Sequence, residues 1–526
     1  MRIAVDMTKC QSYAQCAFLA PDVFRFEGDE ALVYDPDPAE EFRARVTQSA
    51  AACPVQAIRL DGEHRRAVPK AVNPSAPASS ALGPSALTET DRVVVVGASL
   101  AGLTAAEALR SDGFLGPITL IGDEPDEPYD RPPLSKQVLL GTASASGTRL
   151  PQVSGLDVEW RLGVAATGLD VDARAVLLAD GARVPYDRVL IATGTRARPW
   201  PVADEAALDG VFTLRTSADA ARLRSRLAAG PRRVLIVGGG FTGSEIASAC
   251  RRLDLPVTLV DRGPAPLARA LGDTVAGVLA DVQREHGVDL RSLVTVSRLH
   301  SDERGAVAAA TLSDGTTLDV DLVVVAIGAL RNTEWLSESG LSVGPLGVDC
   351  DATCRALDSD GTVLDGVFVA GDIAAFPHPS GDGRRMSVEH WGNAVGQATV
   401  AAGNMLTGAN VHHDEVPVFW SNQFGHVIKS VGMPEAADSV VIAQGSTEKR
   451  SFVAVYGVGD RMVGATALDQ VKWLEHYRRE INDGAAFPPT GRTVDSLPGT
   501  DRSVRPHSRA SRPTTIPAKS DERTTL

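Results

Sequence analysis

Residues 234–247 read VLIVGGGFTGSEIA: four apolar residues, a glycine-rich turn and the start of a helical pattern. A buried strand, such a turn and a helix together bind a dinucleotide pyrophosphate, because glycine lets the backbone approach it closely. The three fingerprint glycines are Gly238, Gly240 and Gly243. Asp261 ends the next apolar strand, where a carboxylate accepts hydrogen bonds from a ribose 2′-hydroxyl and repels a 2′-phosphate. The stretch therefore predicts a dinucleotide site that favours NADH over NADPH.

A second copy of this pattern lies earlier in the chain, where residues 93–102 read VVVVGASLAG. The fingerprint is Gly97, Ser99 and Gly102, with serine at the second glycine position. Asp123 or Glu124 follows the next strand and is placed to bind ribose hydroxyls. Strands that alternate with helices predict parallel sheets, and the two copies indicate two dinucleotide-binding units.

Composition narrows the functional classes. The 526 residues carry 52 basic and 66 acidic side chains, for a net charge of −14. Nucleic acid is not expected as a ligand, because phosphate binding needs a concentrated basic surface. No apolar run approaches the roughly 18 residues of a membrane span, and the N-terminus lacks the apolar core of a signal peptide. We therefore expect a cytoplasmic protein without membrane insertion.

Three of the six cysteines lie in the first 61 residues, as Cys10, Cys16 and Cys53, and Pro54 follows the last of them. Thiolates grouped in one loop, with a distant Cys-Pro, are typical of an iron–sulfur cluster. Tyr13 stands where a further loop cysteine would complete a four-iron site, so three thiolates favour a [3Fe-4S] cluster. Whether Tyr13 tunes the potential or ligates a fourth iron stays open. The alternatives are structural thiols or a zinc site, although zinc normally takes four ligands.

The segments DMTKC (6–10), CAFLAPDVF (16–24) and CPVQAI (53–58) resemble the single-cluster bacterial ferredoxins that serve haem-thiolate monooxygenases. From about 92 to 484 the chain resembles the putidaredoxin-reductase-like FAD-dependent ferredoxin reductases. The segments that carry this second resemblance include GDEPDEPYDRPPLSK (122–136), IATGTRARP (191–199), VAGDIAAF (369–376), MSVEHWGNAVGQ (386–397) and VPVFWSNQFG (416–425).

The resemblances imply an α/β flavoprotein with the two-dinucleotide-binding, glutathione-reductase-type fold, a C-terminal α+β domain and a small α+β ferredoxin-like module. The expected division is a [3Fe-4S] ferredoxin module at 1–61, a flexible linker at 62–91, a FAD-binding domain at 92–205 and 330–410, an NAD-binding domain at 206–329, a C-terminal reductase domain at 411–484 and a disordered tail at 485–526.

The reductase resemblance also implies site residues. The residues implied to bind FAD are Ala101, Asp123, Lys136, Ala166, Arg196, Asp372 and Trp391. Lys136 and Glu245 are implied to form an ion pair near the flavin N5, where the pair would orient the nicotinamide. Gly328 corresponds to a turn on the nicotinamide side, although Arg331 stands in that loop where proline is common.

Residues 98–200 contain no cysteine, so the redox cysteine pair of the disulfide reductases is missing. We therefore expect hydride to pass from NADH to FAD, then single electrons to the cluster and from there to an oxygenase. The ferredoxin resemblance implies that the oxygenase is a cytochrome P-450 monooxygenase. Separate ferredoxins are possible further acceptors. The linker would keep the two redox partners at high effective concentration. The alternatives are an NADH oxidase or peroxide reductase with an appended cluster, and a redox sensor.

Overall fold

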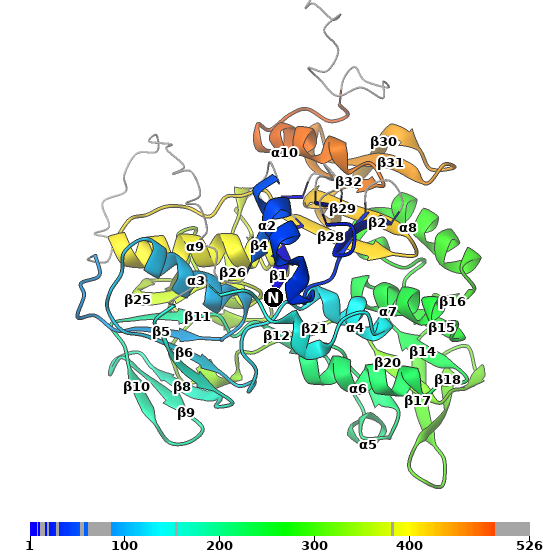
Figure 1. Ribbon diagram of the computed structural model, residues 1–526, viewed down its shortest axis with the longest axis horizontal. Helices are drawn as coiled ribbons and strands as arrows, with labels where there is room; N and C mark the ends of the chain where they lie inside the picture. The colour runs from blue at the N-terminus through cyan, green and yellow to red at the C-terminus, as the bar shows by residue number, and fades with distance from the viewer. Residues whose placement is uncertain are drawn as a thin grey trace, which may run out of the picture.

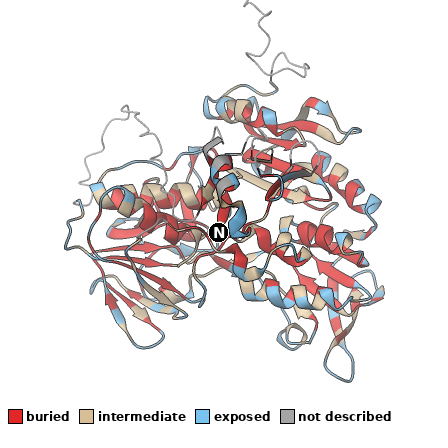
Figure 2. Cartoon of the chain, in the orientation of Figure 1, coloured by how far each residue is buried: buried red, intermediate tan, exposed pale blue. Residues whose placement is uncertain are grey.

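The computed structural model describes residues 1–7, 9–10, 16–17, 20–27, 31–52, 57–60, 86–152, 156–379 and 383–489. Two parallel sheets and one antiparallel sheet form the body of the molecule, and the N-terminal module, dark blue in Figure 1, lies against it. The central strands of each sheet are buried, as Figure 2 shows. Apolar residues on both faces of a strand require cover on both sides, which is typical of α/β folds.

The first parallel sheet has the strand order β24-β25-β11-β5-β6-β7, in which only β24 runs antiparallel to its neighbour. Helices α3 and α9 cover one face, and the three-stranded sheet β10-β9-β8 packs on the other. The bounds are β5 Val93–Val96, α3 Leu100–Ser111, β6 Ile118–Gly122, β7 Glu159–Leu162, β8 Ala166–Asp170, β9 Ala175–Leu178, β10 Arg183–Pro185, β11 Arg188–Ile191, β24 Arg355–Leu357, β25 Val363–Val369 and α9 Trp391–Thr407.

The second parallel sheet has the order β13-β20-β14-β15-β16 and holds the other glycine-rich turn, between β14 and α7. Strands β12 and β21 pair where the chain passes between the two dinucleotide units. The bounds are β12 Thr195–Ala197, β13 Val211–Phe212, α6 Ser217–Ala228, β14 Val234–Val237, α7 Phe241–Arg252, β15 Val257–Asp261, α8 Ala268–Glu285, β16 Val288–Ser292, β17 Val296–Ser301, β18 Val307–Leu312, β19 Thr317–Asp319, β20 Leu322–Val325 and β21 Ala329–Arg331.

The C-terminal domain is an antiparallel sheet of order β28-β29-β32-β31-β30 with helix α10 packed on it. The bounds are β28 Val418–Gln423, β29 His426–Gly432, β30 Ser439–Ser446, β31 Ser451–Val458, β32 Arg461–Leu468 and α10 Leu474–Asn482. Packed contacts extend beyond the expected boundaries of the reductase at both ends. The Leu87 N–H donates to the Leu406 carbonyl, and the Phe487 N–H donates to the Asp460 carbonyl.

The N-terminal module pairs β1 with β4 and β2 with β3, both antiparallel, around a core that includes Ile3, Phe24 and Val46. The bounds are β1 Ile3–Val5, β2 Phe24–Glu27, β3 Ala31–Tyr34, α2 Arg43–Ala52 and β4 Ile58–Leu60. Figure 1 shows the module beside β28 and β29 and close to the short helix α4, Gln137–Leu140. Most of the expected linker at 62–91 and of the expected tail at 485–526 lies outside the described residues, which omit 61–85 and 490–526.

Candidate active site

Both glycine-rich turns have a backbone that only glycine fits. Gly97 and Gly238 have φ values of +117° and +106°, and a Cβ on either would lie 2.1 or 2.3 Å from a carbonyl oxygen of the neighbouring strand end. A Cβ on Gly102 or Gly243 would lie 2.0 or 1.9 Å from the carbonyl of the turn below it. The helices α3 and α7 therefore begin close against their strands, with their N-terminal amides directed to where a pyrophosphate binds.

A cavity in two adjoining parts lies at the carboxyl ends of the first parallel sheet. The outer part is lined by Gly97, Asp123, Ala166 and Arg196, among others. The inner part is lined by Ala101, Lys136, Glu245, Asp372 and Trp391, among others. Because the two parts share lining residues, they form one elongated site of the shape that an extended dinucleotide such as FAD requires.

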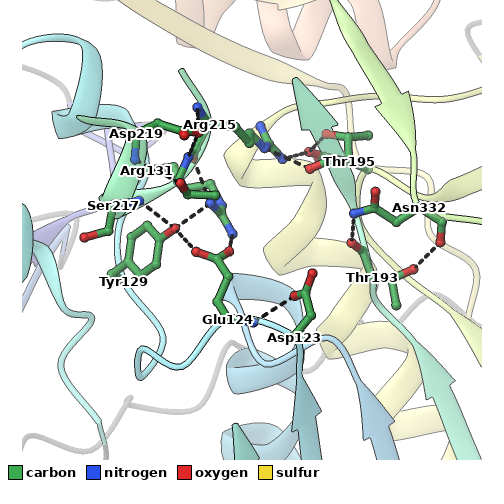
Figure 3. Close-up of polar contacts among 12 residues, drawn as sticks. Asp123, Glu124, Tyr129, Arg131, Thr193, Thr195, Arg215, Ser217, Asp219 and Asn332 are labelled. Atoms are coloured by element: carbon green, nitrogen blue, oxygen red, sulfur yellow. Dashed lines mark hydrogen bonds and ion pairs between the residues drawn. The ribbon is translucent and has the colours of Figure 1, made fainter. Parts of the chain in front are cut away.

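Two arginines that the sequence reasoning did not select lie where the two parts of the cavity meet. The Arg215 guanidinium pairs with Asp372 at 2.8 Å and donates to the Thr195 carbonyl at 3.1 Å. Arg131 pairs with Glu124 at 2.7 Å, and both side chains bond to the Tyr129 hydroxyl. Figure 3 shows the polar contacts of Arg131, Glu124, Tyr129, Arg215 and Thr195.

Arg131 could have been found, because it lies inside the segment YDRPPLSK. Arg215 carries no comparable signal. Arg196 lies on the rim of the outer part, and its exposed guanidinium pairs with Glu334.

The Lys136 ammonium lies 2.7 Å from the Glu245 carboxylate. Ser135 and Ser421 donate hydrogen bonds of 2.5 and 2.6 Å to the two oxygens of that carboxylate. The cluster joins three parts of the chain, because Glu245 lies in the first turns of α7 and Ser421 lies on β28. Three donors hold this buried carboxylate in one orientation at the wall of the inner cavity.

The NAD-side residues surround the second glycine-rich turn. The Asp261 carboxylate accepts from the backbone N–H groups of Gly239 and Gly263, at 2.5 and 2.7 Å. It is therefore fixed at the end of β15, directly over the turn. Gly328 follows β20 with a φ of +100°. Phe241 begins α7 and lines the inner cavity near Glu245.

The sequence assigns the cluster to the module, and the structure describes two of the three proposed ligands. Cys10 and Cys16 are half-buried, are not joined by a disulfide, and pack on the module core. Cys53 and Tyr13 lie outside the described residues. Thiolates at the edge of an apolar core suit an iron–sulfur cluster, so the two described donors fit one.

The remaining cysteines line neither part of the cavity. Burial raises the pKa of Cys250 to about 12 and also raises the pKa of Cys350 and of Cys354. A protonated, buried thiol is a poor nucleophile.

The module docks beside the inner cavity. Arg59 pairs with Glu107 of α3 at 2.8 Å, and the Lys429 ammonium donates to the Cys10 carbonyl at 2.8 Å. The Tyr34 hydroxyl reaches Asp130 at 3.4 Å, and Asp130 accepts from the Trp391 indole at 2.9 Å.

Burial raises the pKa of Asp130 to about 6. This carboxylate thus links a side chain of the module to a wall of the inner cavity. Sequence reasoning missed it.

Three family models match the chain. Residues 91–398 match pyridine nucleotide-disulphide oxidoreductase, residues 418–496 match the reductase C-terminal domain, and residues 5–60 match the 4Fe-4S single cluster domain of ferredoxin I. The first match covers more than half of the chain, so the chain belongs to the pyridine nucleotide-disulphide oxidoreductase family.

Relatives narrow this class. Rhodocoxin reductase of Rhodococcus erythropolis is 35% identical over 72% of this chain and 86% of its own. The ferredoxin–NAD(+) reductase component of the p-cumate 2,3-dioxygenase system of Pseudomonas putida is 33% identical over 79% of this chain and 99% of its own. The covalent putidaredoxin reductase–putidaredoxin complex superposes with a TM-score of 0.71 at 31% identity, over 76% of this chain and 94% of that one.

The chain is an NADH-dependent ferredoxin reductase fused to an N-terminal single-cluster ferredoxin. Its cofactors are FAD, NADH and an iron–sulfur cluster. Within the described residues, no helix combines the length and apolar character that crossing a bilayer requires.

Proposed function

We propose that this chain passes electrons from NADH through FAD to its own [3Fe-4S] cluster, and from there to a cytochrome P-450 monooxygenase. The observation that carries the proposal is the position of the module. Cys10, a proposed cluster ligand, lies against β29, because the Lys429 ammonium donates to its carbonyl. Trp420 lines both the inner cavity and the cleft between module and reductase. A short path between the two redox sites suits transfer within one chain.

The protein's own residues bind and orient the reactants. The amides at the start of α3 and α7 receive the two pyrophosphates, and Asp261 receives the NADH ribose. The paired Lys136 and Glu245 hold fixed charges at the wall of the inner cavity, where they would orient the nicotinamide beside the flavin. FAD, when bound, supplies the conversion of one two-electron hydride into two single electrons.

The cluster type rests on the ligand count. The matching family model describes a four-iron cluster, whereas Tyr13 replaces the cysteine that would complete such a site here. Three cysteines, Cys10, Cys16 and Cys53, suffice for a three-iron cluster. An oxidised [3Fe-4S] cluster gives an EPR signal in the protein as isolated.

The oxygenase is inferred from the module, which resembles ferredoxins that serve haem-thiolate monooxygenases. One structural relative is the ferredoxin reductase for the CYP199A2 system of Rhodopseudomonas palustris, at 31% identity and a TM-score of 0.68. Other relatives belong to dioxygenase systems, such as the biphenyl dioxygenase system. Because Cys10 contacts β29 in the docked module, we expect the module to leave this position to meet an oxygenase, and the linker would permit that.

The test is an anaerobic titration with NADH, followed by optical and low-temperature EPR spectra. The proposal expects loss of the flavin absorbance and of the three-iron signal. A reduced flavin beside a cluster that stays oxidised would contradict it and would favour a separate ferredoxin or a sensor role. A cysteine-free cavity wall argues against the peroxide reductase alternative.

A further inference from the structure

Lys429 is a buried lysine that contacts Cys10, a proposed cluster ligand. It lies in the middle of β29, is 5% exposed, and its ammonium donates to the Cys10 carbonyl at 2.8 Å. Lysine is rarely buried this deeply unless it is paired. The hydrogen-bond acceptor of Lys429 is the backbone of a proposed cluster ligand, and the carboxylates of Asp6 and Glu475 interact with the ammonium electrostatically. The contact brings a positive charge to Cys10.

The strand register places this charge on the path between the two redox sites. Lys429 lies directly opposite Trp420 on β28 and Ala467 on β32, so the three side chains share one face of the sheet. Trp420 lines the inner cavity and also the cleft between module and reductase. The module therefore docks on the face that carries both the tryptophan and the buried charge.

Reduction of the cluster adds one negative charge next to Cys10 and breaks no bond in the module. A buried positive charge beside Cys10 stabilises the reduced cluster more than the oxidised cluster, because water screens the attraction between the two charges poorly there. Charge, hydrogen bonds and solvent exposure are the main determinants of iron–sulfur potentials. When the module leaves β29, water replaces the Lys429 ammonium and this stabilisation is lost.

We propose that Lys429 couples docking to the redox state: the reduced module docks more tightly than the oxidised one, and the docked cluster has the more positive reduction potential. This inference rests on the proposed function, in which the same module collects an electron from the reductase and then leaves. By thermodynamic linkage, the logarithm of the ratio of the two docking constants sets the shift in reduction potential. A tenfold preference, which we expect, corresponds to about 59 mV for one electron.

The coupling would divide the work between two steps. While docked, the cluster is the better acceptor for an electron that NADH has delivered to FAD. After release, its potential falls, and it becomes the better donor to an oxygenase. Lys429 is thus a positioning residue that also sets the direction of transfer.

The test measures the midpoint potential of the cluster in full-length protein, by EPR-monitored titration with dithionite and redox mediators. Lys429→Gln should lower the midpoint by about 59 mV, the shift for a tenfold change in the docking ratio. Lys429→Arg keeps the positive charge, so its midpoint potential should equal that of the wild type. Lys472→Gln removes an exposed lysine of the same domain and should also change nothing.

A salt series makes the test independent of how well the glutamine variant folds. Small-angle X-ray scattering reports whether the module is docked at each ionic strength. In wild type the midpoint should fall as the module undocks, and the difference from Lys429→Gln should vanish. An unchanged or more positive midpoint potential in Lys429→Gln would overturn the inference. So would a wild-type midpoint potential that stays constant as the module undocks. These titrations use no NADH, so failure of NADH to reduce the cluster would count against the proposed function alone.

Discussion

Replacing Arg215 with methionine should weaken FAD binding much more than the same replacement at Arg196. The Arg215 guanidinium lies where the two parts of the cavity meet and pairs there with Asp372 at 2.8 Å. Methionine removes a cation that would attract the anionic FAD and leaves the Asp372 carboxylate without this partner. Arg196 lies on the rim of the outer part. Its side chain is 45% exposed, and that of its partner Glu334 is 67% exposed.

The two sites differ in magnitude because they differ in exposure. A hydrogen bond to a charged group contributes about 1.5–3 kcal/mol, so we expect a loss of about 2 kcal/mol at Arg215, or roughly 30-fold in FAD affinity. An exposed ion pair contributes about 0–1 kcal/mol, so Arg196→Met should cost less than about fivefold. Arg215→Lys keeps the charge without the planar fork and should fall between wild type and Arg215→Met.

The assay is reconstitution of the apoprotein with FAD, with the dissociation constant taken from quenching of flavin fluorescence. Circular dichroism of each apoprotein checks that the fold is retained. A loss at Arg196 equal to or larger than the loss at Arg215 would refute the placement of FAD across the two parts of the cavity, and would favour the sequence-based assignment.

Three further replacements probe the remaining parts of the site. Glu245→Gln keeps the size of the side chain but removes one acceptor oxygen and the charge that pairs with Lys136. Stopped-flow flavin reduction by NADH should therefore slow about tenfold at unchanged FAD content, a change of about 1.4 kcal/mol. An unchanged rate would argue against a role of the pair in hydride transfer. Asp261→Ser should reduce the ratio of kcat/KM for NADH to kcat/KM for NADPH about tenfold, because the repulsion of a 2′-phosphate is lost. An unchanged ratio would contradict this role of Asp261. Arg59→Met removes the partner of the buried Glu107 carboxylate, so X-ray scattering at low salt should show more molecules with an undocked module. Arg45→Met changes an exposed ion pair within the module and should leave docking unchanged. Equal effects of the two replacements would argue against the docked position.

Local features were predictable from the sequence because local geometry dictates the residue. A strand–glycine–helix turn needs glycine where φ is positive and where a Cβ would strike a carbonyl, as at Gly97 and Gly238. Spacing alone therefore located both dinucleotide turns. The contact between Lys136 and Glu245 needed a family resemblance, because these residues meet only after two domains pack together.

The missed residues depend on tertiary packing. Arg215 stands just before α6 with no local signal, and only the packed domains bring it to Asp372. Asp130 and Lys429 gain their roles from the docked module, whose position no periodicity encodes. From sequence alone, a lysine in the middle of a strand is expected to face solvent. Lys429 is instead buried where the separate module packs against the strand.

The most direct test of the central claim, transfer within one chain, is the concentration dependence of cluster reduction. Anaerobic protein is mixed with excess NADH in a stopped-flow instrument, and cluster reduction is followed by rapid-freeze EPR over a tenfold or wider range of protein concentration. The account predicts a first-order rate that does not change with protein concentration. A rate that rises in proportion to protein concentration would show transfer between molecules, and would contradict the docked module as the route of the electron.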